Sequence, residues 1–204
     1  MTAKPLRLLL ASSNPGKLAE FRELAAGGKP PMVLDLLPGF ASVPAFDESA
    51  ETIAENAAGK AIYYGRRVSD WVMADDSGLV VPALNGEPGV RSSRYAGPEG
   101  DAARNIAKLL AALRGKTGTE REAGFVCVLA LARGGRVEAV FSDSVSGTIL
   151  EAPRGAGGFG YDPVFFHAPS GKTFAELPRA EKNQMSHRGR AFAKLAAFLA
   201  NGRI

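Results

Sequence analysis

Two adjacent carboxylates in the middle of the chain, Asp75 and Asp76, place the strongest constraint on its fold. An apolar run at 71–74 precedes them, and a second apolar run follows at 79–81. Two carboxylates at the end of a buried strand need partners, because a buried charge without one is costly to desolvate. Successive side chains of a strand point to opposite faces, so the two residues cannot share one role. We expect one to face a cleft and the other to be satisfied by backbone donors or by a base.

A turn is the alternative for the same segment. The sequence Asp-Asp-Ser-Gly at 75–78 consists of residues that favour turns. Taken alone, the segment fits a turn better than a catalytic site, and the other motifs of the chain reverse that preference.

The order of apolar runs and amphipathic segments predicts an α/β fold with a mixed sheet. Strands are expected at 6–11, 32–37, 125–132 and 137–149, the last two joined as a hairpin at 134–135. Residues 71–83 are expected to form a strand or a hairpin. Helices are expected from Pro15 with Asn14 as N-cap, from Thr52 to about Arg67 with Glu55 as the acid of a capping box, at 101–114, and after Ser186. The 204 residues can bury a substantial core, and we expect a single domain over 1–204.

The composition is typical of a soluble globular protein, with 46% hydrophobic and 23% charged residues. The net charge of +4 fits an anionic ligand such as a nucleotide, and it gives little support to nucleic-acid binding. Cys127 is the only cysteine, so an intrachain disulfide is excluded and a buried, inert thiol is expected. No apolar stretch approaches membrane-spanning length, and the run at 6–11 is too short for a signal peptide. We therefore expect no membrane partner and a cytoplasmic location.

The segment Ser-Ser-Asn-Pro-Gly-Lys at 12–17 connects the first expected strand to the first expected helix. Hydroxyl groups, an amide, the free N–H groups of a helix start and an ammonium converge there, as they do in phosphate-binding sites. The spacing of a Walker A loop is absent. A capped helix with a surface lysine is the alternative.

A glycine-rich segment at 155–160 matches the dinucleotide fingerprint Gly-x-Gly-x-x-Gly literally. The residues after it predict a turn and a strand instead of a helix, so the match does not indicate a Rossmann site. A flexible loop that carries Phe159 and Tyr161 suits stacking on a base better. A structural turn with its aromatic residues in the core is the alternative.

His187 and Arg188 open the last expected helix. Cationic or donor groups at a helix N-terminus are unfavourable to the helix dipole, and an anionic or carbonyl-bearing ligand would offset that cost. A solvated surface pair is the alternative.

Five carboxylates could supply ligands for Mg²⁺, which takes one or two of them and completes its shell with water and phosphate. They are Asp47, Glu48, Glu55, Asp75 and Asp76. With two histidines and one cysteine in the chain, a zinc site is not expected.

Taken in order, these segments resemble the Ham1/RdgB family of non-canonical purine nucleoside triphosphate pyrophosphatases, which are inosine triphosphatase-like. Each motif alone is weak, but the ordered set is specific and spans nearly the whole chain. The motifs are Ser-x-Asn-x-x-Lys at 12–17, Glu-Asn-Ala-x-x-Lys-Ala at 55–61, Ala-Asp-Asp-Ser-Gly-Leu at 74–79, Ser-Arg-Tyr-Ala-Gly at 93–97, Gly-Gly-Phe-Gly-Tyr-Asp-Pro at 157–163, Gly-Lys-Thr-Phe-Ala-Glu-Leu at 171–177 and Ser-His-Arg-Gly at 186–189.

The resemblance implies an elongated mixed sheet with flanking helices, and two lobes that enclose a nucleotide cleft. It implies a homodimer that uses Mg²⁺ to hydrolyse ITP, dITP or XTP to the monophosphate and pyrophosphate. Such an activity would cleanse the nucleotide pool.

Site residues carry over by position. The triphosphate would be held by Ser12, Ser13, Asn14, Pro15, Gly16 and Lys17. The base pocket would comprise Phe159, Gly160, Tyr161, Asp162, Lys182, His187 and Arg188, with Ser77 also beside the substrate. Asp76 would be the general base or a metal-linked carboxylate. Asp47 occupies the family's metal-carboxylate position, where related chains often have Glu, and neighbouring Glu48 could replace it.

The roles that the resemblance implies agree with the chemistry of phosphate hydrolysis. Mg²⁺ neutralises phosphate charge and acidifies water, Asp76 accepts a proton, and Lys17 and Lys60 stabilise the leaving pyrophosphate. Two other classes stay open at this point. A non-catalytic nucleotide sensor could use the same residues, and a redox enzyme built on the glycine loop would bind NAD tightly.

Overall fold

The computed structural model describes residues 6–28 and 32–201, which form an α/β fold. Seven strands of these residues build one mixed sheet, in the order β2-β1-β3-β4-β5-β6-β7. The strands are β1 (Leu6–Ala11), β2 (Met32–Leu36), β3 (Trp71–Val80), β4 (Glu122–Arg133), β5 (Arg136–Ile149), β6 (Phe165–His167) and β7 (Lys172–Thr173). The helices are α1 (Pro15–Ala26), α2 (Ile53–Gly65), α3 (Ala102–Ala112), α4 (Arg179–Met185) and α5 (His187–Ala200). The predicted fold class is confirmed.

The chain divides into two compact units. Unit 1 comprises Met1–Asp76, Cys127–Asp143 and Arg188–Ile204, and unit 2 comprises Ser77–Val126 and Ser144–His187. Strands β3, β4 and β5 contribute residues to both units. The expectations of one domain over 1–204 and of two lobes around a nucleotide cleft stay predictions.

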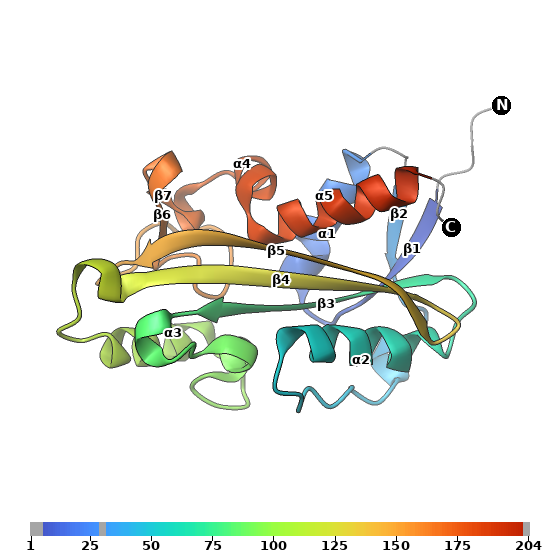
Figure 1. Cartoon of the computed structure of the whole chain (residues 1–204), viewed down its shortest axis with the longest axis horizontal. Helices are drawn as coiled ribbons and strands as arrows, with labels where there is room; N and C mark the ends of the chain where they lie inside the picture. The colour runs from blue at the N-terminus through green and yellow to red at the C-terminus, as the bar shows by residue number, and fades with distance from the viewer. Residues whose placement is uncertain (1–5, 29–31, 202–204) are drawn as a thin grey trace. The chain divides into compact units, whose positions relative to one another are not determined.

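In unit 1, β1 is a buried parallel strand, and Leu8, Leu9 and Leu10 are fully buried. It pairs in parallel with β2 on one side and with β3 on the other. Helices α1 and α5 lie on one face of these strands and α2 lies on the other, as Figure 1 shows. Burial on both faces explains why the strand is a continuous apolar run. The register pairs Ala11 with Ala74, so the segment after β1 begins next to Asp75 and Asp76.

Unit 2 has its own hydrophobic core, centred on aromatic rings. The ring of Phe125 lies 4.6 Å from that of Phe165 and 6.0 Å from that of Phe174. Helix α3 adds its apolar face, with Ile106 and Leu109 in the same cluster. The unit therefore supports its glycine-rich loop and α4 with a core separate from that of unit 1.

Several helix starts and turns follow the expected local chemistry. Asn14 caps α1, and Thr52 and Glu55 form a complete capping box at the start of α2. The hairpin between β4 and β5 turns at Gly134 and Gly135, whose φ angles are 56° and 76°. These three predictions are confirmed, because each depends on a few neighbouring residues.

Strand β3 corrects the expectation for the central carboxylates. It runs without a break from Trp71 to Val80, so Asp75 and Asp76 lie inside a strand and the turn alternative is wrong. The residues beyond them are held extended, since Leu79 is fully buried and its N–H donates to Ser92 Oγ at 2.8 Å. Tertiary contacts here outweigh the turn preference of the local sequence.

Helix α4 was not expected from the sequence. Its seven residues hold few apolar side chains, so they show no helical periodicity. Within the part of the chain that the structure describes, no helix has the length and the apolar character required to cross a bilayer.

Candidate active site

The segment between β1 and α1 is a capped helix start. Asn14 Oδ1 accepts a hydrogen bond from the Lys17 N–H at 3.0 Å, and the Asn14 N–H donates to Ser12 Oγ at 3.2 Å. Pro15 occupies the first helical turn, where its missing N–H is tolerated. The cap fixes the direction in which the Lys17 side chain leaves the helix.

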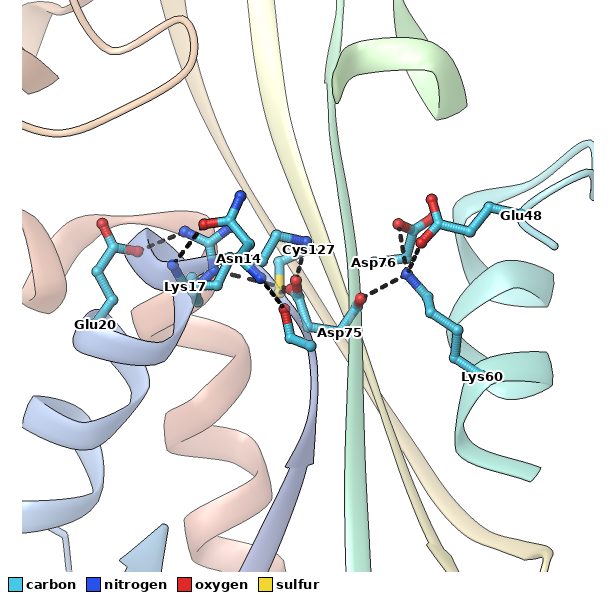
Figure 2. A network of polar contacts seen from close by, with 10 residues as sticks. Asn14, Lys17, Glu20, Glu48, Lys60, Asp75, Asp76 and Cys127 are labelled. Carbon is cyan, nitrogen blue, oxygen red and sulfur yellow. Dashed lines mark hydrogen bonds and ion pairs between the residues drawn. The ribbon is translucent and has the colours of Figure 1, made fainter. Parts of the chain in front are cut away.

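Asp75 and Asp76 point to opposite sides of β3, as Figure 2 shows. Asp75 faces Lys17 and Cys127, whereas Asp76 faces Lys60 and Glu48. The expectation that the two carboxylates serve different purposes is confirmed at the level of their contacts. Each side of the strand therefore carries its own charged network.

The Asp75 network consists of Lys17, Glu20, Asp75, Cys127 and Arg188. The Lys17 ammonium pairs with Asp75 Oδ1, and Cys127 Sγ donates to Asp75 Oδ2 at 3.2 Å. Arg188 Nη1 donates to Glu20 Oε2 at 2.5 Å, and Arg188 Nε lies 3.8 Å from Asp75 Oδ2. Asp75, Glu20 and Arg188 are only 1%, 2% and 3% exposed. Cys127 is a buried thiol, as expected, and its contact with Asp75 was not predicted.

Burial of Arg188 is compensated by its carboxylate neighbours. Desolvation lowers the pKa of Arg188, but the charges of Asp75 and Glu20 outweigh it and raise that pKa, so the guanidinium stays charged. His187 is equally buried, at 3%. The solvated surface pair considered for these two residues is therefore wrong.

The Lys60 network consists of Glu48, Lys60 and Asp76. Lys60 Nζ donates to Glu48 Oε1 at 2.9 Å, to the Asp75 carbonyl at 2.9 Å and to Asp76 Oδ1 at 3.1 Å. Burial would lower the pKa of Lys60, but the charges of Asp76 and Glu48 raise it, so the ammonium is retained. Burial raises the pKa of Asp76 even though Lys60 and Lys17 favour its ionised form. The network therefore contains two carboxylates, those of Glu48 and Asp76, and one ammonium, that of Lys60.

The loop that carries Glu48 is fixed to one face of α2. The Phe46 N–H donates to the Tyr64 hydroxyl at 3.2 Å, and the Ala50 N–H donates to Asn56 Oδ1 at 3.2 Å. A Cβ added at Gly59 would come within 2.5 Å of Phe46 Cζ, so the Phe46 ring packs directly on the helix backbone. These contacts come from three turns of the same helix that carries Lys60.

The carboxylates of Glu48 and Asp76 fit a divalent cation that also binds phosphate. Both contact the same Nζ atom of Lys60, so both reach one small region, whereas Asp47 is exposed to solvent. The described residues contain no group of three or more His, Cys, Asp or Glu arranged for a metal. One or two carboxylates with water and substrate oxygens is, however, the usual environment of Mg²⁺.

The Asp162 network of unit 2 consists of Phe159, Asp162 and Lys182. Lys182 Nζ donates to Asp162 Oδ2 at 2.5 Å, and the Phe159 N–H donates to the same oxygen at 2.9 Å. The Lys182 ammonium also lies 5.0 Å from the centre of the Phe159 ring. A Cβ at Gly158, whose φ is 70°, would overlap Asp162 Oδ2. The buried Asp162 carboxylate thus holds the glycine-rich loop in one conformation.

The aromatic residues of this loop have different environments. Tyr161 is 4% exposed, and its hydroxyl donates to the Ser92 carbonyl at 2.9 Å. Burial raises the pKa of Tyr161, which keeps the hydroxyl protonated. Phe159 is partly exposed, so its ring is the one that could contact a base. The core alternative is correct for Tyr161.

His187, at the start of α5, stacks on Phe125 with ring centres 4.8 Å apart.

The expected site residues divide between the two units. Unit 1 holds Ser12, Ser13, Asn14, Pro15, Gly16, Lys17, Asp47, Glu48, Lys60, Asp76 and Arg188. Unit 2 holds Ser77, Phe159, Gly160, Tyr161, Asp162, Lys182 and His187. Arg188, expected in the base pocket, lies in unit 1, and its role stays a prediction. Glu20 was not expected at all, although its place three residues after Lys17 puts both on one side of α1.

The chain is similar to known proteins over nearly its whole length. The model of the Ham1 family matches residues 8–198. The dITP/XTP pyrophosphatase of Geobacillus kaustophilus (strain HTA426) is 50% identical over 188 residues, covering 92% of this chain and 91% of the relative. That of Gloeobacter violaceus (strain ATCC 29082 / PCC 7421) is 47% identical over 195 residues, covering 96% and 95%.

Solved structures show the same similarity. A HAM1 protein from Coxiella burnetii has a TM-score of 0.85 at 40% identity, covering 96% of this chain and 99% of the other. The Staphylococcus aureus Ham1 protein has a TM-score of 0.83 at 38% identity, covering 97% of this chain and 100% of the other. The mixed α/β fold is therefore shared with these proteins.

Proposed function

Because this chain belongs to the Ham1 family, we propose that it hydrolyses ITP, dITP and XTP to the nucleoside monophosphate and pyrophosphate. Relatives that match nearly its whole length are dITP/XTP pyrophosphatases. The observation that carries the proposal is the pair of charged networks on the two sides of β3, one containing Lys17 and the other containing Asp76. Lys17, which pairs with Asp75, provides a cation for phosphate oxygens, and Asp76, the next residue of β3, provides a carboxylate for water.

The triphosphate is held by the segment after β1. Lys17 supplies an ammonium, the N-terminus of α1 supplies a favourable dipole, and Ser12 and Ser13 supply hydroxyls. The cap by Asn14 keeps the segment in one conformation. Prior ordering of this kind lowers the entropy lost when a flexible triphosphate binds.

Glu48 and Asp76 would hold Mg²⁺. When bound, the ion would supply neutralisation of phosphate charge and a lower pKa of water. Glu48 is preferred to Asp47 because the contacts of Phe46 and Ala50 bring Glu48 to Lys60. Removing Mg²⁺ with a chelator should abolish pyrophosphate release.

Asp76 accepts the proton of the water that attacks phosphorus. Its raised pKa makes it a stronger base than an exposed aspartate, which brings it closer to the optimum for a general base at neutral pH. Lys60 is 2.9 Å from the Asp75 carbonyl and 3.1 Å from Asp76, and it stabilises negative charge that develops on the leaving pyrophosphate.

The base is recognised by residues of unit 2. Phe159 provides a partly exposed ring for stacking, and the His187 ring provides a hydrogen-bond donor. Lys182 contributes through Asp162, which it shares with the Phe159 N–H, and so orders the loop that carries Phe159. Donors favour the 6-keto oxygen of hypoxanthine and xanthine over the 6-amino group of adenine. A homodimer, which rests on the family resemblance alone, and a cytoplasmic location complete the proposal.

Measurement of pyrophosphate release from ITP, dITP, XTP, GTP and ATP with Mg²⁺ tests this function. ITP, dITP and XTP should each yield one pyrophosphate and no orthophosphate, at rates well above those for GTP and ATP. Stoichiometric orthophosphate from ITP would contradict the proposed bond cleavage. Binding of ITP without hydrolysis would instead identify a sensor, and tight binding of NAD would identify a redox enzyme.

A further inference from the structure

The ammonium of Lys60 lies between the two carboxylates that would hold Mg²⁺. Its Nζ atom donates to Glu48 Oε1 at 2.9 Å, to Asp76 Oδ1 at 3.1 Å and to the Asp75 carbonyl at 2.9 Å. Figure 2 shows how these three oxygens converge on Nζ. An ammonium has three donors, so the three oxygens use all of them. Lys60 therefore has the oxygen-rich surroundings that a hard cation prefers.

A divalent cation bound to the same two carboxylates would exclude this ammonium. Mg²⁺ binds oxygen at about 2.0–2.1 Å, closer than a hydrogen bond from an ammonium, and it draws its carboxylates toward itself. Two cations in contact repel each other strongly wherever little water screens them. The side chains of Lys60 and Asp76 are only 8% and 10% exposed, so screening is weak here. The ammonium and the ion are therefore alternative partners of Glu48 and Asp76.

We propose that the Lys60 ammonium competes with the divalent cation for Glu48 and Asp76, and that it is displaced when a triphosphate accepts its hydrogen bonds. The ion and the triphosphate then favour each other's binding, because the anion removes the competitor of the ion. The identities of the ion and of the anion rest on the proposed function. Lys60 thereby acts during binding as well as on the leaving pyrophosphate.

The surroundings of Lys60 support this exchange of partners. Its ammonium is carried on a flexible four-carbon chain, and the side chain of Glu48 is 33% exposed, so the network opens to solvent there. An ammonium that leaves two carboxylates loses Coulomb stabilisation, and a phosphate group can restore it. The segment at 12–17, proposed to hold the triphosphate, begins beside Asp75 and Asp76 through the pairing of Ala11 with Ala74.

Two other roles for Lys60 predict different effects on metal binding. A structural role, in which the ammonium holds the carboxylates together, predicts that its loss weakens metal binding, because Glu48 and Asp76 then repel each other. A general electrostatic role predicts the same gain in metal affinity on loss of any nearby lysine charge. Competition at contact predicts a gain that is specific to Lys60.

Binding of Mn²⁺ to metal-free protein without nucleotide, measured by electron paramagnetic resonance, separates these roles. Lys60→Met removes the ammonium and keeps an unbranched side chain. We expect it to bind Mn²⁺ at least about tenfold more tightly than the wild type, which corresponds to about 1.4 kcal/mol. Lys60→Arg keeps the charge and should show no gain. Lys17→Met is the matched control, since Lys17 pairs with Asp75 instead, and its gain should be several-fold smaller.

A second measurement tests the coupling to the triphosphate. Calorimetry gives the affinity of the α,β-methylene analogue of ITP with and without saturating Mn²⁺, for the wild type and for Lys60→Met. The ratio of the two affinities includes binding of Mn²⁺ to the analogue in solution, which is common to both proteins and cancels when the ratios are compared. The ratio should be larger for the wild type, by about the factor that Lys60→Met gains for Mn²⁺ alone.

Each outcome decides the inference. Weaker or unchanged Mn²⁺ binding by Lys60→Met would overturn it, and so would an equal gain in Lys17→Met or equal coupling ratios in the two proteins. Binding that is detectable only in Lys60→Met agrees with competition, whereas no binding by either protein contradicts it. If Lys60→Met does not fold, Lys60→Gln removes the same charge and should show the same gain. If the gain appears but the wild type releases no pyrophosphate from ITP, the proposed function fails and the inference stands.

Discussion

Each unit contains a buried lysine that contacts aspartate, and the two lysines lie in different surroundings. In unit 2, the side chains of Lys182 and Asp162 are 3% and 4% exposed. In unit 1, the side chain of Lys60 is 8% exposed and contacts Asp76 and Glu48, which are 10% and 33% exposed. The first network is closed to solvent, whereas the second opens to it through Glu48.

The difference in solvent exposure indicates a different role for each network. A closed pair such as Lys182 and Asp162 has no route for an incoming ion, and its oxygen is also bonded to the Phe159 amide. It fixes the conformation of the glycine-rich loop. The Lys60 network combines two carboxylates with one ammonium at a partly open position, an arrangement that suits a cation and a proton acceptor.

The largest effect is expected from Lys182→Met, which leaves Asp162 buried without this ammonium. Breaking one partner of a buried pair costs about 3–5 kcal/mol, so the free energy of unfolding in urea should fall by about that amount. Lys60→Met should cost less stability, because its carboxylates are closer to solvent. The variant Asp162→Asn/Lys182→Met removes both charges and should recover part of the loss. Equal destabilisation by Lys182→Met and Lys60→Met would remove the distinction between the two networks.

Asp76→Asn should lower kcat for ITP by at least about a hundredfold, the usual scale for a positioned base. Asn has nearly the same shape, but it is a poor base and a weaker Mg²⁺ ligand. Steady-state pyrophosphate release measures the loss, and circular dichroism checks that the fold is retained. A folded, fully active Asp76→Asn protein would refute the role of the more open network.

Local features of the fold were predictable because their causes are local. The cap by Asn14 and the capping box of Thr52 and Glu55 depend on residues three positions apart, and the sequence displays them directly. The hairpin at Gly134 and Gly135 follows in the same way. The order of motifs along the chain also predicted the family, which is confirmed.

Long-range features could not be predicted in this way. Glu20 and Arg188 are 168 residues apart, and nothing in either neighbourhood indicates that they meet. The sequence left β3 open between a continuous strand and a turn, because turn-forming residues at 75–78 are kept extended by tertiary contacts. The solvated alternative for His187 and Arg188 could not be excluded from the sequence for the same reason, since burial of the Arg188 cation depends on carboxylates from distant segments.

A smaller effect is expected on the pH dependence of kcat/KM. Burial raises the pKa of Asp76, and its ionised form is required both as a base and as a metal ligand. Activity should therefore fall on the acid side at a pH above the ordinary range of aspartate. Lys60→Met removes a positive charge that lowers this pKa, so the acid limb should move to higher pH. An acid limb that stays in place in Lys60→Met would show that another group controls it.

The smallest effect is expected from Tyr64→Phe, which removes the hydroxyl that accepts the Phe46 N–H. The loss of one hydrogen bond costs about 0.5–1.5 kcal/mol, and here it loosens the loop that carries Glu48. The Mg²⁺ concentration for half-maximal activity should rise a few-fold, whereas kcat at saturating Mg²⁺ should be unchanged. Tyr95→Phe removes a hydroxyl that donates to Glu87 in unit 2, and it should leave the Mg²⁺ requirement as in the wild type. An unchanged Mg²⁺ requirement in Tyr64→Phe would mean that Glu48 does not depend on this anchor, and that the more open network is positioned from β3 and α2 alone.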